Sequence, residues 1–348
     1  MCEHAFVRWD NLTIAEDEGT RLPGYRDPAT VRRFDAPEAL DVRFYEIHAK
    51  SAINRVPKVS QMPFRWTINP YRGCTHACLY CFARPTHTYL DFDAARDFER
   101  EIVVKVNAPE VVRAELGRPS WKGEHVAMGT NTDPYQWVES RYRLMPGIWE
   151  ALRDARNPCS ILTKSPLLLR DIELMKQIAA VTDIHANLSI PTLDAKAWRA
   201  TEPHTPHPKA RLEAVAALNG AGIPTGVLIA PLMPGINDGP EQLEPLLEAA
   251  AAAGATGIGG IALHLRGDVK ALFFDWLRSQ RPDLVATYEA LYARGAYAPL
   301  RERRRLQALV RREPEQTWPS RFRQPAEETE AAERASPPLP PALQQSLF

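Results

Sequence analysis

Six short apolar segments, each an expected strand, alternate with amphipathic segments from about residue 64 to residue 265. Strands and helices that alternate this regularly form a parallel sheet with right-handed crossovers. Six units are too few to close an eight-stranded barrel, so the sequence predicts an α/β fold built on a partial (β/α)6 TIM-type barrel. Active residues of such sheets lie at the carboxyl ends of the strands. The expected strands are 65–69, 125–128, 160–163, 184–189, 226–230 and 257–265, and the expected helices between them are 109–116, 145–156, 166–180, 208–219 and 241–253.

The barrel is expected to occupy residues 61–268, in the middle of the chain. Residues 1–60 are polar and show little periodicity, so we interpret them as an N-terminal extension that wraps the main domain. Three helical segments follow the last strand and are expected to form a C-terminal cap over 269–313. Residues 314–348 are rich in Pro, Glu, Ala and Arg and cannot bury enough apolar surface to offset the entropy of ordering. We therefore predict a disordered tail.

Composition narrows the classes of protein that the chain can belong to. Hydrophobic residues make up 45% and charged residues 25% of the 348 residues, the balance of a globular protein. No stretch approaches ~18 uninterrupted apolar residues and no basic region precedes an apolar run at the start, so we expect neither a membrane span nor a secretory signal. The expected location is the cytoplasm. With 43 basic and 43 acidic residues the net charge is zero, so a nucleic-acid partner would need a local patch.

The chain has five cysteines, and three of them fall within eight residues, as Cys74, Cys78 and Cys81. Such a cluster is a poor disulfide framework and indicates metal binding or catalysis in a reducing compartment. Three thiolates on one loop can hold three irons of a cubane and leave the fourth iron open, as a catalytic metal centre requires. The alternative is a structural zinc ion with His76 or His87 as the fourth ligand, although no second cysteine knuckle is present.

The C-x3-C-x2-C spacing, with the aromatic Tyr80 directly before Cys81, resembles the signature of the radical SAM superfamily. The resemblance implies a [4Fe–4S] cluster on the three cysteines, with S-adenosylmethionine (SAM) on the open iron. Reductive cleavage of SAM, with an electron donor such as flavodoxin or ferredoxin, would give a 5′-deoxyadenosyl radical that abstracts hydrogen from the substrate. The protein would position the cofactors and exclude water. The segments 129–136, 162–165 and 230–238 further resemble the spore photoproduct lyase-like branch, often called DNA repair photolyase.

The resemblance implies that polar residues at the strand ends bind SAM. Thr130, Asn131 and Asp133, which follow the second strand, would accept hydrogen bonds from the amino group of SAM. The alternative is that this segment is an ordinary turn. Lys164 could pair with the carboxylate, or be a solvated lysine. Ser189 would hydrogen-bond SAM or, alternatively, cap a helix. Ala230 and Pro231 would pack on the adenine or simply form part of a loop. The full set of expected cofactor-binding residues is Tyr80, Thr130, Asn131, Asp133, Lys164, Ser189, Ala230 and Pro231.

The sequence departs from spore photoproduct lyases at the expected end of the second strand. Those enzymes carry a hydrogen-donating cysteine there, whereas this chain has Gly129 after Met128. Cys159 opens the third strand, at the end that faces away from an active site. The departure argues against the lyase reaction, unless Tyr135 or Tyr142 relays hydrogen.

Other candidate contacts lie towards the end of the chain. His264 and Arg266 close the sixth strand and are candidates for the substrate site. An expected helix carries Arg301, Arg303, Arg304 and Arg305, which could bind DNA phosphates or be a solvated face. The last five residues resemble the pentapeptide with which bacterial repair and replication proteins dock on the sliding clamp. The resemblance implies that Gln344, Leu347 and Phe348 contact the clamp. Gln345 stands where the pentapeptide usually has leucine.

Three hypotheses therefore follow from the sequence. The chain is a radical SAM enzyme that acts on nucleic acid, DNA in particular. Alternatively it is a radical SAM enzyme that acts on a peptide or small molecule, or a non-catalytic, metal-stabilised adaptor that docks on the sliding clamp. The sequence leaves open the substrate, the atom that loses hydrogen, and whether SAM is consumed.

Overall fold

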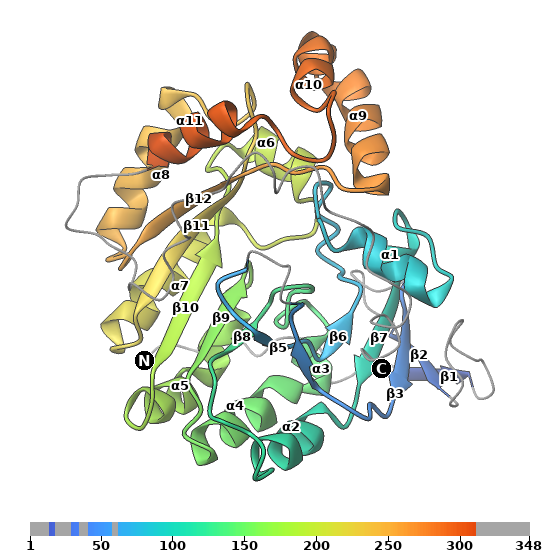
Figure 1. Ribbon diagram of the computed structural model, residues 1–348, viewed down its shortest axis with the longest axis vertical. Coiled ribbons are helices and arrows are strands. Elements are labelled where there is room, and N and C mark those ends of the chain that lie inside the picture. The colour runs from blue at the N-terminus through green and yellow to red at the C-terminus, as the bar shows by residue number, and fades with distance from the viewer. Residues whose placement is uncertain (1–13, 18–28, 35–40, 58–61, 311–348) are drawn as a thin grey trace.

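The computed structural model describes residues 14–17, 29–34, 41–57 and 62–310, which form two sheets surrounded by helices (Figure 1). The larger sheet is a partial barrel of six parallel strands, with β4 antiparallel at its edge, in the order β12-β11-β10-β9-β8-β5-β4. This confirms the α/β class and the (β/α)6 barrel. Its strands are β4 (Ile53–Arg55), β5 (Trp66–Ile68), β8 (Val126–Met128), β9 (Cys159–Thr163), β10 (Ile184–Ser189), β11 (Thr225–Leu232) and β12 (Ile258–Ala262).

The helices expected between these strands are present on the outer side of the curved sheet (Figure 1). Ser165 begins the third of them, because its Oγ accepts a hydrogen bond from the Leu167 N–H at 3.2 Å. This segment starts as a 3-10 turn before it becomes α-helical. The helices are α2 (Ala108–Leu116), α4 (Leu144–Asp154), η2 (Pro166–Asp171) with α5 (Ile172–Ala179), α7 (Pro208–Gly220) and α8 (Pro240–Ala252).

A second sheet, which the sequence did not predict, stands beside β5 in the order β1-β2-β3-β7-β6. Its strand β7, between β5 and β8 in the chain, is buried throughout. Strands β2, β3 and β4 come from the expected N-terminal extension, and β3 runs parallel to β7. The extension is thus built into both sheets. The strands are β1 (Ile14–Asp17), β2 (Thr30–Phe34), β3 (Arg43–Ile47), β6 (Tyr71–Arg72) and β7 (Glu101–Lys105).

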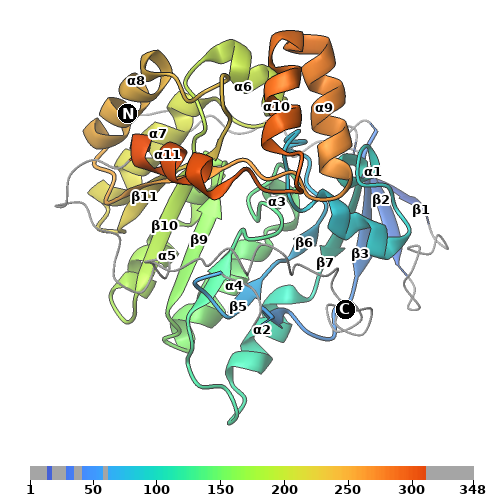
Figure 2. The same ribbon diagram turned by 45° about the horizontal axis from the view of Figure 1, so that its top comes forward.

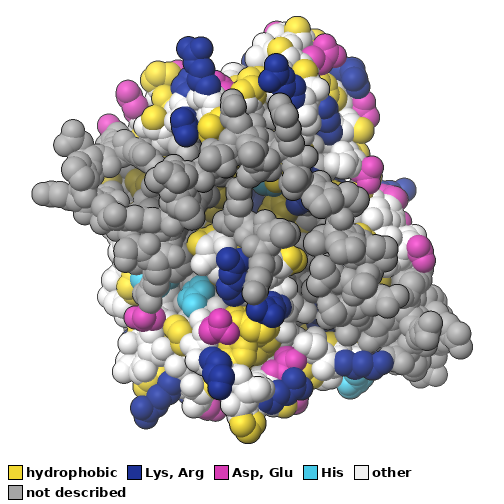
Figure 3. Space-filling model, in the orientation of Figure 1, with side chains coloured by type: hydrophobic (Ala, Val, Ile, Leu, Met, Phe, Trp, Pro, Cys, Tyr) yellow, Lys and Arg dark blue, Asp and Glu magenta, His cyan; other side chains and the backbone are white. Residues whose placement is uncertain are grey.

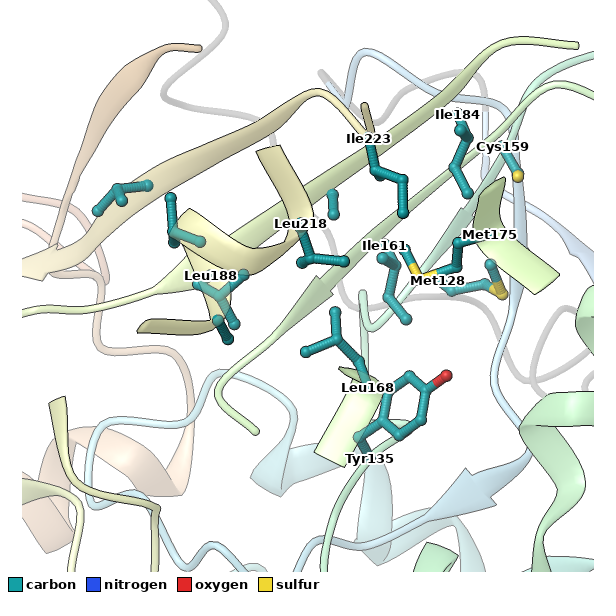
Figure 4. Packing of buried hydrophobic residues seen from close by; sticks show 14 of the residues in the cluster. Met128, Tyr135, Cys159, Ile161, Leu168, Met175, Ile184, Leu188, Leu218 and Ile223 are labelled. Carbon is teal, nitrogen blue, oxygen red and sulfur yellow. The ribbon is translucent and has the colours of Figure 1, made fainter. Parts of the chain in front are cut away.

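The main hydrophobic core lies between the barrel sheet and its outer helices. Met128 and Ile161 from neighbouring strands meet Leu168 and Met175 from η2 and α5, and Leu218 of α7 continues the layer (Figure 4). The inner face of the sheet is therefore free to carry the polar residues of a site. Short helical segments η1 (Arg84–Leu90), α1 (Asp97–Arg100), α3 (Glu139–Tyr142) and α6 (Ala195–Thr201) lie in the connections at the carboxyl ends of the strands.

The three helical segments expected after the last strand are present. The first two stand side by side as a hairpin (Figure 2). The third packs on β12 through Leu306 and Val310, and Gly260 allows the close approach, since a Cβ there would lie 2.7 Å from Val310 Cγ2. The elements are α9 (Asp268–Gln280), η3 (Pro282–Leu284) with α10 (Val285–Leu291), and α11 (Leu300–Val310). Among the described residues, no helix is long and apolar enough to cross a membrane.

Candidate metal and cofactor site

A cavity lies at the carboxyl ends of the barrel strands, where the sequence placed the site. The three motif cysteines line it together with residues that end or follow β8, β9, β10, β11 and β12. Of the expected cofactor-binding residues, all eight line this cavity: Tyr80, Thr130, Asn131, Asp133, Lys164, Ser189, Ala230 and Pro231. The structure thus brings together residues that are up to 190 positions apart in the chain, from Cys74 to His264.

The backbone of the cysteine loop is fixed where it leaves β6. Gly73 has a φ of +78°, and a Cβ on it would lie 2.9 Å from Ile102 Cδ1, so only glycine fits without a shift. The next residue, Cys74, donates its N–H to the Phe98 carbonyl at 2.9 Å. The fully buried Gln136 accepts from the Thr75 N–H at 2.9 Å and donates to the Gly73 carbonyl at 3.2 Å. This glutamine holds the start of the loop from the opposite side.

The end of the cysteine loop is fixed by Arg84. Its guanidinium donates to the carbonyls of Cys78 at 3.0 Å, Ala77 at 3.1 Å and Ala95 at 2.7 Å, and it forms an ion pair with Glu99. Ala77 has a positive φ of 55°, a strained conformation for a residue with a Cβ. The arginine stabilises this turn, because it donates hydrogen bonds to the backbone carbonyls of Ala77 and Cys78.

The thiols suit a [4Fe–4S] cluster. Burial raises the pKa of Cys81 to about 11 and holds that of Cys78 well above its ordinary value, so both thiols stay neutral until a metal displaces their protons. No three His, Cys, Asp or Glu side chains in the described part of the chain are grouped so that they could hold one metal ion. A cubane does not require that grouping, since each thiolate binds a different iron atom.

The histidines of the zinc alternative do not complete a zinc site. His87 does not line the cavity, and its Nε2 lies 2.8 Å from the Glu101 carbonyl oxygen. His76 lines the cavity beside Cys74, and its Nδ1 lies 3.3 Å from Asp133 Oδ2. In the described part of the chain, neither ring is grouped with two further side chains that could hold one zinc ion.

Asp133 anchors the loop that follows β8. Its Oδ1 accepts hydrogen bonds from the Thr163 hydroxyl at 2.6 Å and the Tyr135 N–H at 2.9 Å, and its Oδ2 accepts from the Lys164 N–H at 2.7 Å. Burial acts to raise its pKa, but His76 and these donors outweigh burial and lower it. Because its oxygens are occupied by the protein itself, Asp133 shapes the site. Thr130 and Asn131, half-buried beside it, are the acceptors with room for a ligand.

Lys164 belongs to a buried ionic network at the ends of β9 and β10. Its Nζ lies 2.6 Å from Ser189 Oγ and 2.8 Å from Glu202 Oε1. Glu202 also pairs with Arg211 at 2.7 Å and accepts a hydrogen bond from the Tyr80 hydroxyl. Burial would raise the pKa of Glu202, but Lys164 and Arg211 hold it at about 2. Tyr80, two residues from Cys78, is thereby tied to the strand ends.

The loop after β11 completes the wall of the cavity. Ala230 and Pro231 are joined by a cis peptide bond. Asn237 fastens the loop, since its side chain donates to the Pro231 carbonyl at 3.0 Å and accepts from the Met233 N–H at 2.6 Å. An apolar wall of this kind can pack against a flat ring.

The expected hydrogen relays Tyr135 and Tyr142 do not line the cavity. Tyr135 is turned into the core (Figure 4), where its hydroxyl donates to Asp171 at 2.7 Å and accepts from Trp149 Nε1 at 2.7 Å. Tyr142 packs against Phe34 and other rings at the second sheet, and burial and Glu46 raise its pKa. Both rings are held by buried aromatic and polar partners that the sequence did not identify.

Of the two residues expected to close the sixth strand, only His264 lines the cavity. Burial, assisted by the charge of Arg266, lowers the pKa of His264 to about 4, so its ring is neutral at physiological pH. Arg266 is exposed and lies outside the cavity lining. Cys159 is buried at the start of β9 within the core, as its position predicted (Figure 4).

The basic helix is α11, and its four arginines differ in surroundings. Arg305 pairs with Asp238 at 2.6 Å and Glu302 at 2.7 Å, and Arg303 donates to the Ala298 carbonyl at 3.1 Å. Arg301 and Arg304 are exposed. Over the described residues on the face seen in Figure 3, basic side chains are interspersed with acidic ones. The clamp-like residues Gln344, Leu347 and Phe348, and the predicted disordered tail, lie outside the described residues.

Sequence reasoning missed the residues that hold the site together. Gln136 and Arg84 bind loop carbonyls, and Glu202 with Arg211 forms the core of the ionic network. Glu202 follows α6, a helix that the sequence analysis did not find. A signal for that helix existed: Asp194 is a preferred N-cap residue, and its Oδ1 accepts from the Ala197 N–H at 2.6 Å.

The comparisons with known proteins agree with this site. A family model described as the radical SAM superfamily matches residues 68–250. An uncharacterized protein of Mycobacterium tuberculosis is 46% identical over 309 residues, which cover 87% of this chain and 91% of that protein. An uncharacterized protein of Methanocaldococcus jannaschii is 30% identical over 199 residues, covering 57% and 70%. Neither name assigns a reaction.

Solved structures give the same fold. Spore photoproduct lyase complexed with dinucleoside spore photoproduct matches with a TM-score of 0.58 and 16% identity over 77% of each chain. A mutant of that lyase with bound AdoMet and dinucleoside spore photoproduct matches with a TM-score of 0.56 and 15% identity over 76% of each chain. Members of the matched family use a [4Fe–4S] cluster and SAM, and the cysteine cavity suits both. The chain belongs to the radical SAM superfamily.

Proposed function

We propose that this radical SAM enzyme acts on nucleic acid, and on DNA in particular. The observation that carries the proposal is the convergence of the three cysteines, the Lys164 network and the apolar loop after β11 on one cavity. When bound there, the cluster and SAM supply the 5′-deoxyadenosyl radical that removes a hydrogen atom from the substrate. The shared fold with a lyase solved with a dinucleoside photoproduct supports DNA as the substrate class.

Within this function, the residues of the cavity have separate roles. Lys164, held by Ser189, is suited to pair with the SAM carboxylate, and Thr130 and Asn131 offer acceptors to its ammonium group. Pro231 and its neighbour Ala230 provide an apolar surface for the adenine. Tyr80 braces the cysteine loop through Glu202.

The way in which hydrogen returns must differ from that of a lyase with a donor cysteine. Besides the three motif cysteines, no cysteine among the described residues lines the cavity. A side chain at Gly129 is excluded, because a Cβ there would lie 1.8 Å from the Leu162 carbonyl oxygen. We therefore propose a lyase-like or modifying reaction on DNA without a cysteine donor at this strand end.

Anaerobic reconstitution with iron and sulfide tests the proposal. We expect absorbance near ~400 nm from thiolate-bound cluster, and 5′-deoxyadenosine after addition of dithionite and SAM. Cys78→Ser should lose both signals, whereas the matched change Cys159→Ser, in the core, should keep them. Deuterium transfer from labelled DNA into 5′-deoxyadenosine identifies the substrate class. If the site held zinc and SAM were not cleaved, the proposal that the protein is a radical SAM enzyme would be contradicted. If deuterium were transferred from a labelled peptide but not from labelled DNA, the proposal of a DNA substrate would be contradicted.

The partners belong to the same proposal. Arg301 and Arg304 are exposed and suited to DNA phosphates, which predicts binding that weakens steeply with salt. A flavodoxin or ferredoxin would reduce the cluster, and a reducing cytoplasm would keep its thiols available. Deletion of residues 344–348 should abolish retention on an immobilised sliding clamp, and unchanged retention would contradict that contact.

A further inference from the structure

Exposed apolar side chains gather at the mouth of the cysteine cavity. Of the six large hydrophobic residues that are exposed in the described part of the chain, three lie here: Phe82 (45% exposed), Ile261 (41%) and Tyr297 (44%). Phe82 and Ile261 line the cavity directly. Exposed apolar surface concentrated in one place marks a binding site more often than chance.

Three of the rings at this place form a contiguous surface. His264 stacks on Tyr297 with ring centroids 5.5 Å apart and planes 27° from parallel, and its other neighbour, Phe82, lies at 5.6 Å. We call Phe82, His264 and Tyr297 the aromatic platform. The platform continues from the cavity, which Phe82 and His264 line, outward to Tyr297.

Backbone hydrogen bonds hold two of the three rings of the platform in place. His264 and Tyr297 pair as an antiparallel bridge, and the Leu265 N–H donates to the Ala296 carbonyl at 2.7 Å. Beneath them, the buried Tyr292 hydroxyl donates to the Leu263 carbonyl at 2.7 Å. The segment after β12 and the C-terminal cap therefore fix His264 and Tyr297, whereas Phe82 follows Cys81 in the cysteine loop.

Positive charge flanks the platform. The guanidinium of Arg303 lies 5.9 Å from the centre of the Tyr297 ring, and Arg266 is exposed two residues after His264. Ring faces beside guanidinium groups are the combination that binds single-stranded nucleic acid, because bases stack on the rings while phosphates pair with arginine.

We propose that the aromatic platform stacks an unpaired base of the nucleic-acid substrate, with Arg266 and Arg303 beside the adjacent phosphates. The inference rests on the proposed function and deepens it, since it names the form of the substrate. A base reaches this surface only when it is outside a duplex, so the enzyme takes a single-stranded or extruded nucleotide.

Binding of a fluorescein-labelled oligothymidylate to the reconstituted full-length protein tests the platform. Fluorescence anisotropy at low salt is compared with that of an abasic oligomer of the same length and charge. We expect Tyr297→Leu and Phe82→Leu each to weaken oligothymidylate binding by about tenfold, because one stacked ring is lost. The affinity for the abasic oligomer should not change. Tyr297→Phe, which keeps the ring, should bind as the wild type does.

The matched control is Val181→Ala. Val181 is 43% exposed, and it lies between α5 and β10, at the opposite end of the strands. It should alter neither affinity. The platform is contradicted if the wild type binds both oligomers equally, or if Tyr297→Leu weakens both to the same extent. A fall in SAM affinity in Tyr297→Leu, with oligothymidylate binding intact, would also overturn it, because the ring would then serve the adenine of SAM.

The two proposals fail separately in this design. Absence of SAM cleavage by the wild type contradicts the proposed function whatever the anisotropy shows. Unchanged oligothymidylate binding by Tyr297→Leu contradicts the platform while SAM cleavage and deuterium transfer from DNA remain.

Discussion

The Nζ atom of Lys164 lies 2.8 Å from Oε1 of Glu202, and the same carboxylate accepts the hydroxyl of Tyr80 in the cysteine loop. A cationic side chain of the cavity and the cluster-binding loop are thus joined through one buried acid. Arg211, fully buried, supplies the second positive charge that this acid requires.

Removal of the Glu202 charge should destabilise the protein strongly. In Glu202→Gln, Lys164 and Arg211 are left buried without a counter-ion, which should lower the free energy of unfolding by about 3–5 kcal/mol. Anaerobic urea denaturation measures the loss. Glu173→Gln, which breaks only the exposed pair with Lys176, is the control and should cost no more than about 0.5 kcal/mol. Equal effects of the two changes would show that the network is not a source of stability.

Replacement of Lys164 should weaken SAM binding. We expect Lys164→Met to lower the affinity for SAM by roughly 10- to 100-fold, because a charge-assisted hydrogen bond to the carboxylate is lost. Equilibrium dialysis against labelled SAM measures it. Ser189→Ala keeps the lysine and should have a smaller effect. If Lys164→Met bound SAM as tightly as the wild type, Lys164 would serve only to neutralise Glu202.

Arg84 should be needed for the cysteine loop to retain its cluster. Lysine cannot reproduce the fork that binds the Ala77, Cys78 and Ala95 carbonyls, so Arg84→Lys should lose iron faster in the presence of a chelator. Iron and sulfide per chain, followed over time, give the rate. Arg100→Lys, in an exposed pair with Asp41, should lose iron as the wild type does.

Gly129 should tolerate no side chain. In Gly129→Ala the new Cβ would meet the Leu162 carbonyl oxygen at 1.8 Å with φ at +77°, so we expect a loss of at least about 3 kcal/mol of folding free energy. Gly123→Ala is a matched control, because Gly123 has a φ of +67° but open space around it. It should cost only about 1–2 kcal/mol, the strain of the left-handed conformation. If the two substitutions lowered the free energy of unfolding by similar amounts, the strain of the left-handed conformation alone would explain the loss, without the collision with the Leu162 carbonyl oxygen.

Acid should destabilise the protein through His87. Burial, opposed only in part by the Glu101 carbonyl, lowers the pKa of His87 from 6.5 to about 4. The folded state therefore binds fewer protons than the unfolded state, and the stability present above pH 6.5 is lost as the pH falls towards 4. Between pH 7 and pH 4 this group should account for about 3 kcal/mol. Unfolding of His87→Phe should depend less on pH over this range, and an identical dependence would contradict the assignment.

The barrel could be predicted because its strands are short apolar runs separated by clear turn and capping residues. Ser165 before Pro166 marked a helix start that the structure confirms. Strand β7 was missed, since Glu101 and Lys105 at its ends made a buried strand look like part of a charged loop. Its pairing with β3 depends on residues 58 positions apart, for which a local pattern gives no signal.

The candidate site was predictable where a motif or a strand end defined it. The three cysteines and the strand-end residues line one cavity because parallel strands bring their carboxyl ends together. Glu202 was not predictable, since its bond to Tyr80 spans 122 residues and depends on the docking of α6. Tyr135 lies away from the cavity, although it is near a strand end in the sequence. Its hydrogen bonds with Trp149 and Asp171 hold its ring in the core.

The pairing of β3 with β7 has a consequence for the order of assembly. The cysteine loop lies between two lengths of chain that are already hydrogen-bonded to each other through β6 and β7, and protein donors hold both of its ends. Small metal-dependent domains fold only when their ion arrives. In this chain the protein's own hydrogen bonds hold both ends of the loop, so we expect the loop to keep its fold when iron and sulfide are removed.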